Sequence, residues 1–343
     1  MADSHRNAEA ILTHAWQGRG PLACLLWPLS LLFGALAALR RALFAWGFKR
    51  AERLPVPVIV VGNVFVGGTG KTPFSIWLIE ALRAAGYTPG VVSRGYGAGG
   101  AEAVAEVRAD SAAARVGDEP LLIVQRTGVP LVVGRRRAAA GRALLAAHPE
   151  VDVVVSDDGL QHYALARDIE IVLSDARGAG NGWLLPAGPL REPATRRRDF
   201  SVCNLPAGSA APAGSYAMRL EADELVQLAP PSARRPLAGI GADGARIAAV
   251  AGIGNPGRFF ATLRGAGLAF SEHPLPDHYD FSANPFAGLP ADVILITEKD
   301  AVKCKAIEAI KNDPRIWVVP VSARIDGALA EHIVEKLRER PTA

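Results

Sequence analysis

The sequence predicts an α/β protein of two domains, in which a parallel sheet is covered by helices on both faces. Short β-branched runs alternate with helical segments in the first half of the chain, as they do when crossover helices connect parallel strands. The 343 residues are 50% hydrophobic, which is enough to bury an ordinary core, and this length favours two domains.

Charge and cysteine content exclude several classes of protein. The formal net charge is +4 and 6% of the residues are aromatic. A modest positive excess suits anionic partners in general, but no RNA-binding signature or zinc-finger spacing accompanies it, so no nucleic-acid partner is expected. Cys24, Cys203 and Cys304 lie far apart, which predicts neither a zinc site nor a disulfide framework and favours a reducing compartment.

Residues 1–50 are predicted to form a helical segment that associates with a membrane. Residues 21–39 contain no charged side chain, and as a helix they would span about 28 Å. We expect this helix either to cross the bilayer or to lie in its interface. The alternative is a buried helical hairpin that is broken at Pro28.

The residues that follow the apolar run support membrane attachment. Arg40 and Arg41 come directly after it, and Trp46 and Phe48 follow a few positions later. Basic and aromatic side chains of this kind are found at the headgroup boundary of a bilayer. The basic residues place the rest of the chain on the cytoplasmic side.

A glycine-rich loop between a strand and a helix predicts a phosphate-binding site. Residues 56–61 have the pattern of a buried strand, and residues 72–85 have helical spacing. Glycines let backbone N–H groups turn toward phosphate oxygens, Lys71 reaches the β- and γ-phosphates, and Thr72 can ligate Mg²⁺. The first domain therefore has the order of a P-loop NTPase-like parallel sheet. The nucleotide-binding candidates are Gly67, Gly68, Thr69, Gly70, Lys71 and Thr72.

This loop departs from both standard patterns. The strict form G-x-x-x-x-G-K-[ST] requires glycine where the chain has Phe65, and the deviant form requires its signature lysine where the chain has Val66. The sequence predicts binding of a nucleoside triphosphate without assigning the loop to either subclass. A chance glycine loop at a strand-to-helix junction is the alternative.

A later strand delivers two carboxylates to the same edge of the sheet. The further strand-like segments are residues 89–93, 129–133 and 151–155, and residues 135–147 have helical spacing. The last strand leads into Asp157 and Asp158, where a Walker-B-like acid would ligate Mg²⁺ or its water. We expect one of the pair to serve the metal, and an ordinary Asp-Gly turn is the alternative. Gln161 and His162 could orient substrate or cap the turn.

Two other loops carry candidate residues. Asp118 precedes Pro120 and an apolar helical stretch, so from the pattern alone it is either a functional carboxylate or the N-cap of the helix. Arg94 follows a strand and could meet phosphate, and the glycines on either side of Tyr96 would allow close approach. A plain loop is the alternative there.

Together these segments resemble the tetraacyldisaccharide 4'-kinase family of lipid A biosynthesis. Each motif is weak alone, but seven of them in order are specific, and the resemblance runs from about residue 20 to residue 320. The motifs are GGTGKTP (67–73), SRGYG (93–97), GDEP (117–120), DDGLQH (157–162), PAGPLREP (186–193), PDHYDF (276–281) and TEKDAVK (297–303).

The resemblance implies a reaction and a place in the cell. The reaction is transfer of the γ-phosphate of ATP, with Mg²⁺, to the 4'-hydroxyl of a tetraacylated glucosamine disaccharide 1-phosphate. The place is the cytoplasmic face of the inner membrane of a Gram-negative bacterium, in contact with inner-membrane lipid, and no obligate protein partner is inferred. Two α/β domains with the active site in the cleft between them are also implied.

Several site residues follow from the resemblance alone. It puts the catalytic carboxylate on Asp118 and its partner histidine on His278, which composition does not distinguish from His273. Tyr279 stands where the family commonly has a second histidine. The substrate-binding candidates are Arg94, Tyr96, Gln161, His162 and Arg191, and the metal-ligand candidates are Thr72, Asp157, Asp158 and Glu192.

We divide the chain into three parts on these grounds. They are the membrane-associated segment (1–50), a P-loop kinase domain (51–215) and a smaller C-terminal α/β domain that closes the cleft (216–343). Residues 252–257 show G-x-G-x-x-G spacing, which we interpret as a tight turn for domain packing. Lys299 and Asp300 either line the cleft or form a salt-bridged strand end, and residues 326–338 are expected to form a closing helix.

Two other functions fit parts of the sequence. A nucleotide-driven switch or partitioning ATPase would bind a membrane or protein partner and transfer phosphate only to water, but the missing signature lysine at Val66 counts against it. A soluble small-molecule ligase or kinase could share the loop, but the apolar N-terminal segment argues against it.

Overall fold

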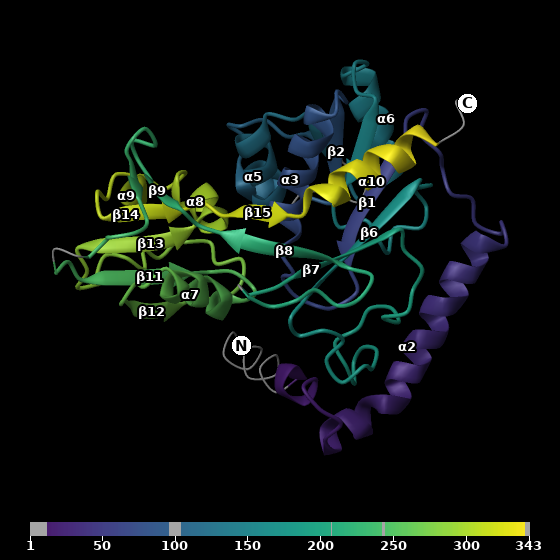
Figure 1. Ribbon diagram of the computed structural model, residues 1–343, viewed down its shortest axis with the longest axis horizontal. Helices are drawn as coiled ribbons and strands as arrows, with labels where there is room; N and C mark the ends of the chain where they lie inside the picture. The colour runs from purple at the N-terminus through teal and green to yellow at the C-terminus, as the bar shows by residue number, and fades with distance from the viewer. Residues whose placement is uncertain (1–11, 96–103, 207, 242–243, 340–343) are drawn as a thin grey trace.

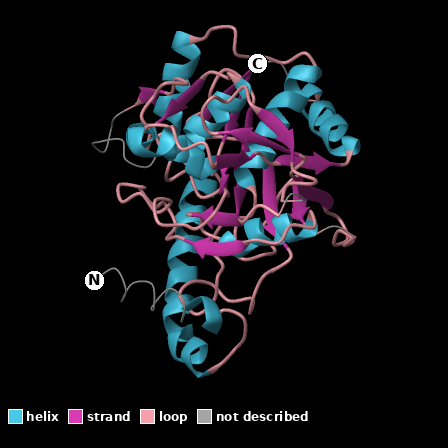
Figure 2. Cartoon of the chain, turned by 90° about the vertical axis from the view of Figure 1, so that its left-hand side faces the viewer, coloured by secondary structure: helices cyan, strands magenta, loops and turns pink. Residues whose placement is uncertain are grey.

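The computed structural model describes residues 12–95, 104–206, 208–241 and 244–339. The strands within these ranges form two sheets. Figure 1 shows the two sheets next to each other and the long helix α2 apart from both. In the perpendicular view of Figure 2, helices flank the strands. The expected α/β fold class is confirmed.

The first sheet has nine strands within the described residues, in the order β15-β8-β7-β6-β1-β5-β2-β4-β3. The strands from β8 to β4 pair in parallel, and the edge strands β15 and β3 are antiparallel to their neighbours. The strands are β1 (Val58–Asn63), β2 (Pro89–Ser93), β3 (Ala105–Glu106), β4 (Leu131–Val133), β5 (Val153–Ser156), β6 (Ile169–Asp175), β7 (Phe200–Asn204), β8 (Tyr216–Glu221) and β15 (Ser322–Ile325).

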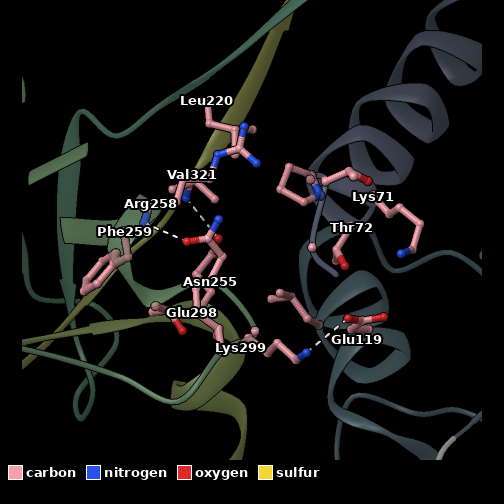
Figure 3. A pocket seen from close by; sticks show the side chains of 18 of the residues that line it. Lys71, Thr72, Glu119, Leu220, Asn255, Arg258, Phe259, Glu298, Lys299 and Val321 are labelled. Carbon is pink, nitrogen blue, oxygen red and sulfur yellow. Dashed lines mark hydrogen bonds and ion pairs between the residues drawn. The ribbon is translucent and has the colours of Figure 1, made fainter. Parts of the chain in front are cut away.

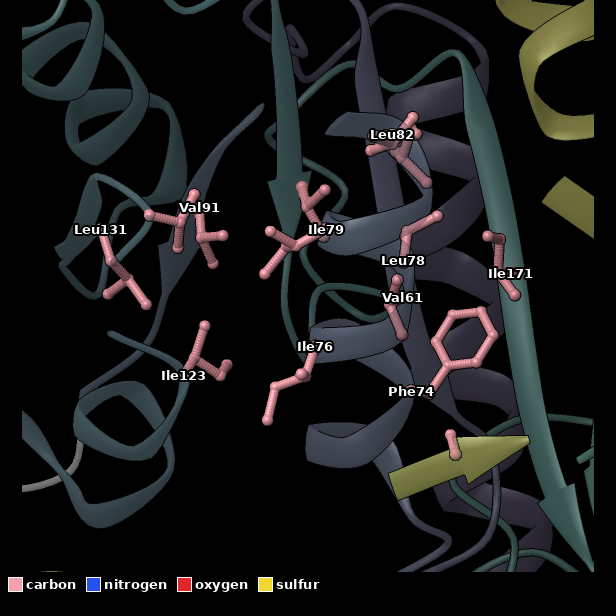
Figure 4. Packing of buried hydrophobic residues seen from close by; sticks show 14 of the residues in the cluster. Val61, Phe74, Ile76, Leu78, Ile79, Leu82, Val91, Ile123, Leu131 and Ile171 are labelled. Atoms are coloured by element: carbon pink, nitrogen blue, oxygen red, sulfur yellow. The ribbon is translucent and has the colours of Figure 1, made fainter. Parts of the chain in front are cut away.

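Strand β1 lies in the middle of this sheet and is buried on both faces. Ile59 and Val61 belong to one hydrophobic core, and Val58 and Val60 belong to the other. Successive side chains of a strand point to opposite faces, so burial on both faces requires the unbroken apolar run seen in the sequence. Figure 4 shows Phe74 of the helix after β1 on the same face as Val61. The helices around this sheet are α3 (Lys71–Ala84), α4 (Ala113–Val116), α5 (Asp118–Thr127), α6 (Arg137–Ala147) and α10 (Gly327–Arg338).

The second sheet has six strands within the described residues, in the order β10-β9-β14-β13-β11-β12. Its strands are β9 (Glu224–Gln227), β10 (Arg234–Pro236), β11 (Ile247–Ala251), β12 (Ser271–Pro274), β13 (Val293–Thr297) and β14 (Ile316–Val319). Helix α7 (Pro256–Gly265) packs into one core, and α8 (Glu298–Cys304) and α9 (Glu308–Lys311) pack into the other. Both faces of this sheet are therefore covered as well.

The chain crosses between the sheets twice, through residues 222–223 and residues 320–321. After the second crossing, β15 pairs with β8, and α10 buries Leu329 and Ile333 in a core of the first sheet. The division at residue 216 therefore differs from the sheet membership, because β8, β15 and α10 belong to the first sheet. An amphipathic pattern shows that a segment has a buried face but not which sheet that face covers.

The apolar N-terminal segment forms one continuous helix, α2 (Pro21–Ala45), that runs through Pro28. The hairpin alternative is therefore wrong. Within the described residues, α2 is the one helix that is long and apolar enough to cross a membrane, with a mean hydropathy of 2.2. Seven of its large apolar side chains are exposed, namely Leu25, Trp27, Leu29, Leu31, Leu32, Leu36 and Leu39.

One face of α2 docks on the loop before β7. Ser30 is 3% exposed, and its hydroxyl donates to the Leu184 carbonyl at 2.7 Å and accepts from the Ala187 N–H at 2.9 Å. A Cβ at Gly34, one turn later, would lie 2.8 Å from a methyl group of Leu184. A polar side chain and a glycine thus fix where the helix meets the domain.

Candidate active site

The phosphate loop between β1 and α3 needs glycine for its backbone conformation. Gly67 has a φ of +104° and Gly70 a φ of +90°, a region that residues with side chains rarely adopt. A Cβ at Gly70 would also lie 2.4 Å from Asn204 Nδ2 and 3.0 Å from Met218 Cε, whereas a Cβ at Gly68 would meet open space. Gly70 is therefore required for two independent reasons.

The carbonyl groups of this loop are held by side chains from β1, from β7 and from the turn after β6. The bonds run from Asn63 Nδ2 to the carbonyls of Phe65 (2.7 Å) and Gly67 (3.0 Å), from Asn204 Nδ2 to that of Thr69 (3.1 Å), and from Arg177 Nη2 to that of Gly68 (3.2 Å). With these carbonyls engaged by the protein, the N–H groups of the loop are the ones available to an anion.

The two departures from the standard loop patterns have structural roles. Phe65 is 8% exposed, forms an isolated bridge with Leu190, and lies beneath the guanidinium of Arg177 at 4.3 Å. The N–H of Val66 donates to the Pro189 carbonyl at 2.9 Å. These residues tie the phosphate loop to the segment that also contacts α2.

Asp157 is a buried carboxylate at the end of β5. It is 1% exposed, and its Oδ1 accepts a hydrogen bond from Ser75 Oγ at 2.9 Å. Burial, followed by the charges of Glu119 and Asp158, raises the pKa of Asp157 to about 6. Negative charge that is only partly compensated gathers here, which is the chemistry that a divalent cation would relieve.

Asp158 lies beside the phosphate loop. It has a φ of +48°, and its Oδ1 is 3.6 Å from Lys71 Nζ and 3.9 Å from Arg191 Nη1. The structure thus brings Asp158, Lys71 and Arg191 together, as their motifs led us to expect.

The resemblance implies that Glu192 faces the magnesium region, but the structure pairs it with arginines and with Tyr163. Glu192 is 2% exposed, both carboxylate oxygens accept from Arg196 Nη1 at 3.0 Å, and Arg41 of α2 lies 3.8 Å from Oε2. These contacts favour a structural ion pair. In the part of the chain that the structure describes, no three His, Cys, Asp or Glu side chains cluster as metal ligands.

Asp118 and His278 meet from different domains. Asp118 is the first residue of α5, and Gly117 occupies the N-cap position without a side-chain cap bond, so the interpretation of Asp118 as the N-cap is wrong. Asp118 Oδ2 lies 3.2 Å from His278 Nδ1, and Oδ1 accepts from the N–H of Glu119 at 3.0 Å. His278 has a φ of +57°, a costly conformation that the surrounding loop imposes.

The charges around this pair determine its protonation. Burial by itself would raise the pKa of Asp118, but the hydrogen bond with His278 and the charges of Lys299, His278 and Lys303 outweigh it and lower that pKa to about 2. The hydrogen bond with Asp118 raises the pKa of His278, against burial and the charge of Lys299. Asp118 is therefore an ionised carboxylate at neutral pH.

Two lysines of α8 approach Asp118 from the second domain. Lys299 Nζ donates to Glu119 Oε1 at 3.1 Å and lies 3.9 Å from Asp118 Oδ2, and Lys303 Nζ lies 3.5 Å from the same oxygen. Figure 3 shows Lys299 and Glu119 reaching toward each other across a pocket, with Thr72 of the phosphate loop nearby. Lys299 thus lines the cleft and also forms ion pairs.

The cavity between the phosphate loop and the second domain has a volume of about 190 Å³. Its second-domain wall includes Gly254, Asn255 and Arg258. The glycine turn that we interpreted as a packing element therefore lines the site. A larger cavity of about 690 Å³ adjoins it and shares Asn255 and Arg258 as lining residues.

The remaining candidates lie around the loop after β5. Gln161 Nε2 donates to the carbonyl of the last residue of β1 at 3.3 Å, and His162 Nε2 accepts from the N–H of Arg137 at 3.3 Å. Burial, followed by the charges of four arginines, lowers the pKa of His162 to about 4; these are Arg137, Arg167, Arg40 and Arg94. Tyr96 lies outside the described residues.

A family model described as Tetraacyldisaccharide-1-P 4'-kinase matches residues 22–338. The chain belongs to this family. It is 59% identical over 348 residues to the tetraacyldisaccharide 4'-kinase of Janthinobacterium sp. (strain Marseille), with 100% of both chains covered. It is also 59% identical over 350 residues to the enzyme of that name from Herminiimonas arsenicoxydans, with 98% of each covered.

A solved structure of this family has the same fold. It is the crystal structure of "apo" form LpxK from Aquifex aeolicus in complex with ATP, with a TM-score of 0.75 and 28% sequence identity over 92% of this chain and 99% of that one. The sequence-based expectation of a kinase of this family is therefore confirmed.

Sequence reasoning missed several residues that shape the kinase site. Asn204 and Arg177 hold the phosphate loop from the ends of β7 and β6, two strands that we did not predict. The run IEIVLSD at β6 has the apolar character of a buried strand, and residues at the carboxyl ends of parallel strands commonly face the site. That rule would have found Asp175, whose carboxylate binds Arg177 at 2.7 Å.

Proposed function

We propose that this chain transfers the γ-phosphoryl group of ATP to the 4'-hydroxyl of a tetraacylated glucosamine disaccharide 1-phosphate. The contact between Asp118 and His278 carries the proposal, because it joins an ionised carboxylate of the phosphate-loop domain to a histidine of the other domain. Glu119 and Lys299, which flank this pair, line the same cavity as the phosphate loop. The ATP complex of the Aquifex aeolicus relative supports ATP as the phosphoryl donor.

Asp118 takes the proton of the acceptor hydroxyl in this reaction. The 4'-oxygen bonds to the γ-phosphorus while the bond from that phosphorus to the β–γ bridging oxygen breaks. ADP leaves, and the hydroxyl proton passes to the Asp118 carboxylate. Phosphoryl transfer has a loose transition state, so the base accepts the proton only as the new bond forms, and a carboxylate of low pKa suffices. His278 holds the carboxylate in place through Oδ2.

The nucleotide phosphates lie against the loop N–H groups and Lys71. In the present structure Lys71 is near Asp158, and we expect it to reach the β- and γ-phosphates when ATP is bound. Thr72 and Asp157 or Asp158 would hold Mg²⁺, with phosphate oxygens and water completing its shell. When bound, the ion would neutralise phosphate charge.

The arginines around His162 suit the anionic end of the acceptor. After burial, the charges of four of them lower the pKa of His162, so several positive charges act on this region. Arginine binds phosphate through two parallel hydrogen bonds, and we therefore assign the 1-phosphate to this region. Arg191, which lies near Asp158, is assigned to the nucleotide side.

Helix α2 is proposed to lie in the membrane interface at the cytoplasmic face of the inner membrane. Its contacts with the kinase domain run from Trp27, whose ring is 6.2 Å from that of Trp183, to Arg41 near Glu192. A spanning helix would carry this polar loop into the hydrocarbon region, where unpaired backbone groups are costly. The exposed apolar side of α2 is free to enter the lipid.

The kinase proposal is tested with purified full-length protein in detergent, γ-labelled ATP, Mg²⁺ and tetraacyl disaccharide 1-phosphate. We expect label in the lipid, and none when the acceptor lacks the 4'-hydroxyl. Asp118→Asn is the matched variant, because it keeps the size of the side chain and removes its charge. Release of labelled inorganic phosphate without labelled lipid would favour the ATPase alternative and refute the proposal.

The orientation of α2 is tested through Cys24, which is exposed, whereas Cys203 and Cys304 are buried. A membrane-impermeant maleimide should label Cys24 in inverted membrane vesicles and leave it unlabelled in intact spheroplasts. Cys24→Ser is the control and should take up no label from either side. Labelling from the periplasmic side would show that the helix crosses the bilayer.

A further inference from the structure

Lys303, the second lysine of the motif TEKDAVK, lies close to Asp118 and to the loop that carries His278. Lys303 comes from α8, is 12% exposed, and is absent from the described residues that line the cavity beside the phosphate loop. Lys299, one turn earlier, does line that cavity. The two lysines therefore have different surroundings although both approach Asp118.

The ammonium group of Lys303 is surrounded by three oxygens from three different parts of the fold. It donates to the carbonyl of Tyr279 at 3.0 Å, lies 3.5 Å from Asp118 Oδ2 and lies 3.9 Å from Asp300 Oδ1. An ammonium group has three N–H donors and no acceptor. The three oxygens around Lys303 therefore equal the three N–H donors of its ammonium group in number.

These contacts connect the base to the loop that holds its histidine. Tyr279 directly follows His278, and Asp118 belongs to the other domain. Lys303 Nζ also lies 5.7 Å from the ring of Phe281, which is fully buried with a φ of +59°. The loop from 278 to 281 thus has two residues in a costly backbone conformation. Lys303 contacts this loop at Tyr279 and Phe281.

Asp300, three residues before Lys303 on α8, forms an ion pair with its ammonium group. It is fully buried, and its Oδ2 accepts from the N–H of Gly252 at 3.0 Å and from Thr297 Oγ1 at 2.7 Å. Its Oδ1 has no hydrogen bond within the described residues, and the charges of Lys303, 3.9 Å away, and of Lys299 partly offset the cost of its burial. A buried carboxylate without such a partner would be strongly unfavourable.

We propose that Lys303 is a positioning residue for phosphoryl transfer, which ties the Asp118 carboxylate to the loop that carries His278. This inference rests on the proposed function. In the absence of Lys303, Asp118 and the His278 loop would be joined by the contact between the two side chains and by the longer contacts of Lys299, whose Nζ lies 3.9 Å from both Asp118 Oδ2 and Asp277 Oδ1. The domains could then still bind ATP and lipid, but the base would be held less firmly where the hydroxyl proton must go.

The test measures kcat, KM and the pH profile of kcat/KM for Lys303→Gln, which can still donate to the Tyr279 carbonyl but has no charge. We expect kcat to fall by about tenfold or more, because a misplaced base slows the chemical step, with both KM values near those of the wild type. The acid limb of the profile should move to higher pH, since a cation that lowers the pKa of Asp118 is lost. His278 and Lys299 still face Asp118 in this variant, so the pKa of Asp118 stays partly lowered.

Three controls separate positioning from simple stability. Lys305→Gln, at the exposed end of the same helix, should change neither kcat nor the acid limb. Lys303→Arg keeps the charge and should restore the acid limb and part of kcat; an arginine variant no better than the glutamine variant would overturn the inference. In an Asp118→Asn background, Lys303→Gln should lower kcat little further. A residue that acts through the Asp118 carboxylate no longer has that carboxylate to position.

The possible failures are distinguishable. A wild-type protein that labels no lipid would overturn the proposed function and this inference with it. An active wild type whose kcat and acid limb are unchanged by Lys303→Gln would overturn this inference alone. If Lys303→Gln does not fold, Lys303→Arg is taken through the same Asp118→Asn cycle, where a loss of kcat that persists undiminished would equally refute positioning through Asp118.

Discussion

Gly70→Ala tests the geometry of the phosphate loop most directly. The backbone at Gly70 has a φ of +90°, which costs a residue with a side chain about 1–2 kcal/mol. The new Cβ would lie 2.4 Å from Asn204 Nδ2, so Asn204 must move and lose its bond to the Thr69 carbonyl. Leaving a buried polar group without a partner costs about 1–3 kcal/mol. We expect the free energy of unfolding to fall by about 2–5 kcal/mol.

Two other glycines separate the contributions. Gly86 has a φ of +91° and open space around its Cβ position, so Gly86→Ala should show the backbone cost alone, about 1–2 kcal/mol. Gly68 has neither a positive φ nor a neighbour within 4 Å. Gly68→Ala should therefore leave stability within about 0.5 kcal/mol of the wild type.

The assay is urea unfolding of the full-length protein in detergent, followed by tryptophan fluorescence, together with calorimetric ATP binding. The unfolding midpoint should be highest for Gly68→Ala, intermediate for Gly86→Ala and lowest for Gly70→Ala. ATP binding should weaken in Gly70→Ala because the loop N–H groups shift with the backbone. If Gly70→Ala unfolds at the same urea concentration as Gly86→Ala, the close contact with Asn204 contributes nothing, and the reasoning is refuted.

Three further predictions follow from the site and its surroundings. Asp118→Asn should lower the pKa of His278, because the hydrogen bond with Asp118 is the largest cause of its raised value; an NMR titration that finds an unchanged pKa would contradict this. Asp157→Asn should raise the Mg²⁺ concentration for half-maximal activity by about tenfold or more, and an unchanged requirement would remove Asp157 from the metal site. Ser30→Ala should speed hydrogen exchange of the Ala187 N–H by about fivefold or more, as loss of a buried hydrogen bond costs at least about 1 kcal/mol; equal exchange would mean that Ser30 does not secure α2.

Local patterns in the sequence specified the elements that depend on neighbouring residues. The apolar run before the glycines produced β1, and the helix after Lys71 formed as α3. The uncharged N-terminal run formed a long helix. These features depend on side-chain alternation, glycine φ angles and helix length, all of which are set within a few residues of chain.

The order of the motifs gave more than local patterns could, because it identified the family, and the resemblance singled out Asp118 and His278. Composition could not separate His278 from His273, and the structure does. His273 lies on the edge strand β12 and contacts Ser271 Oγ at 3.0 Å, whereas His278 reaches Asp118 across the domains. The two histidines differ because His273 lies within strand β12, whereas His278 lies in the loop after this strand, at the cleft between the domains.

The sequence by itself thus determined the phosphate loop, the apolar helix and the fold class, since each follows from short-range patterns. Only the tertiary structure decided that Glu192 pairs with Arg196, that β15 and α10 return to the first sheet, and that Lys303 joins Asp118 to the His278 loop. These are contacts between segments far apart in the chain. Their partners are chosen by how the sheets and helices pack, which no local pattern of residues encodes.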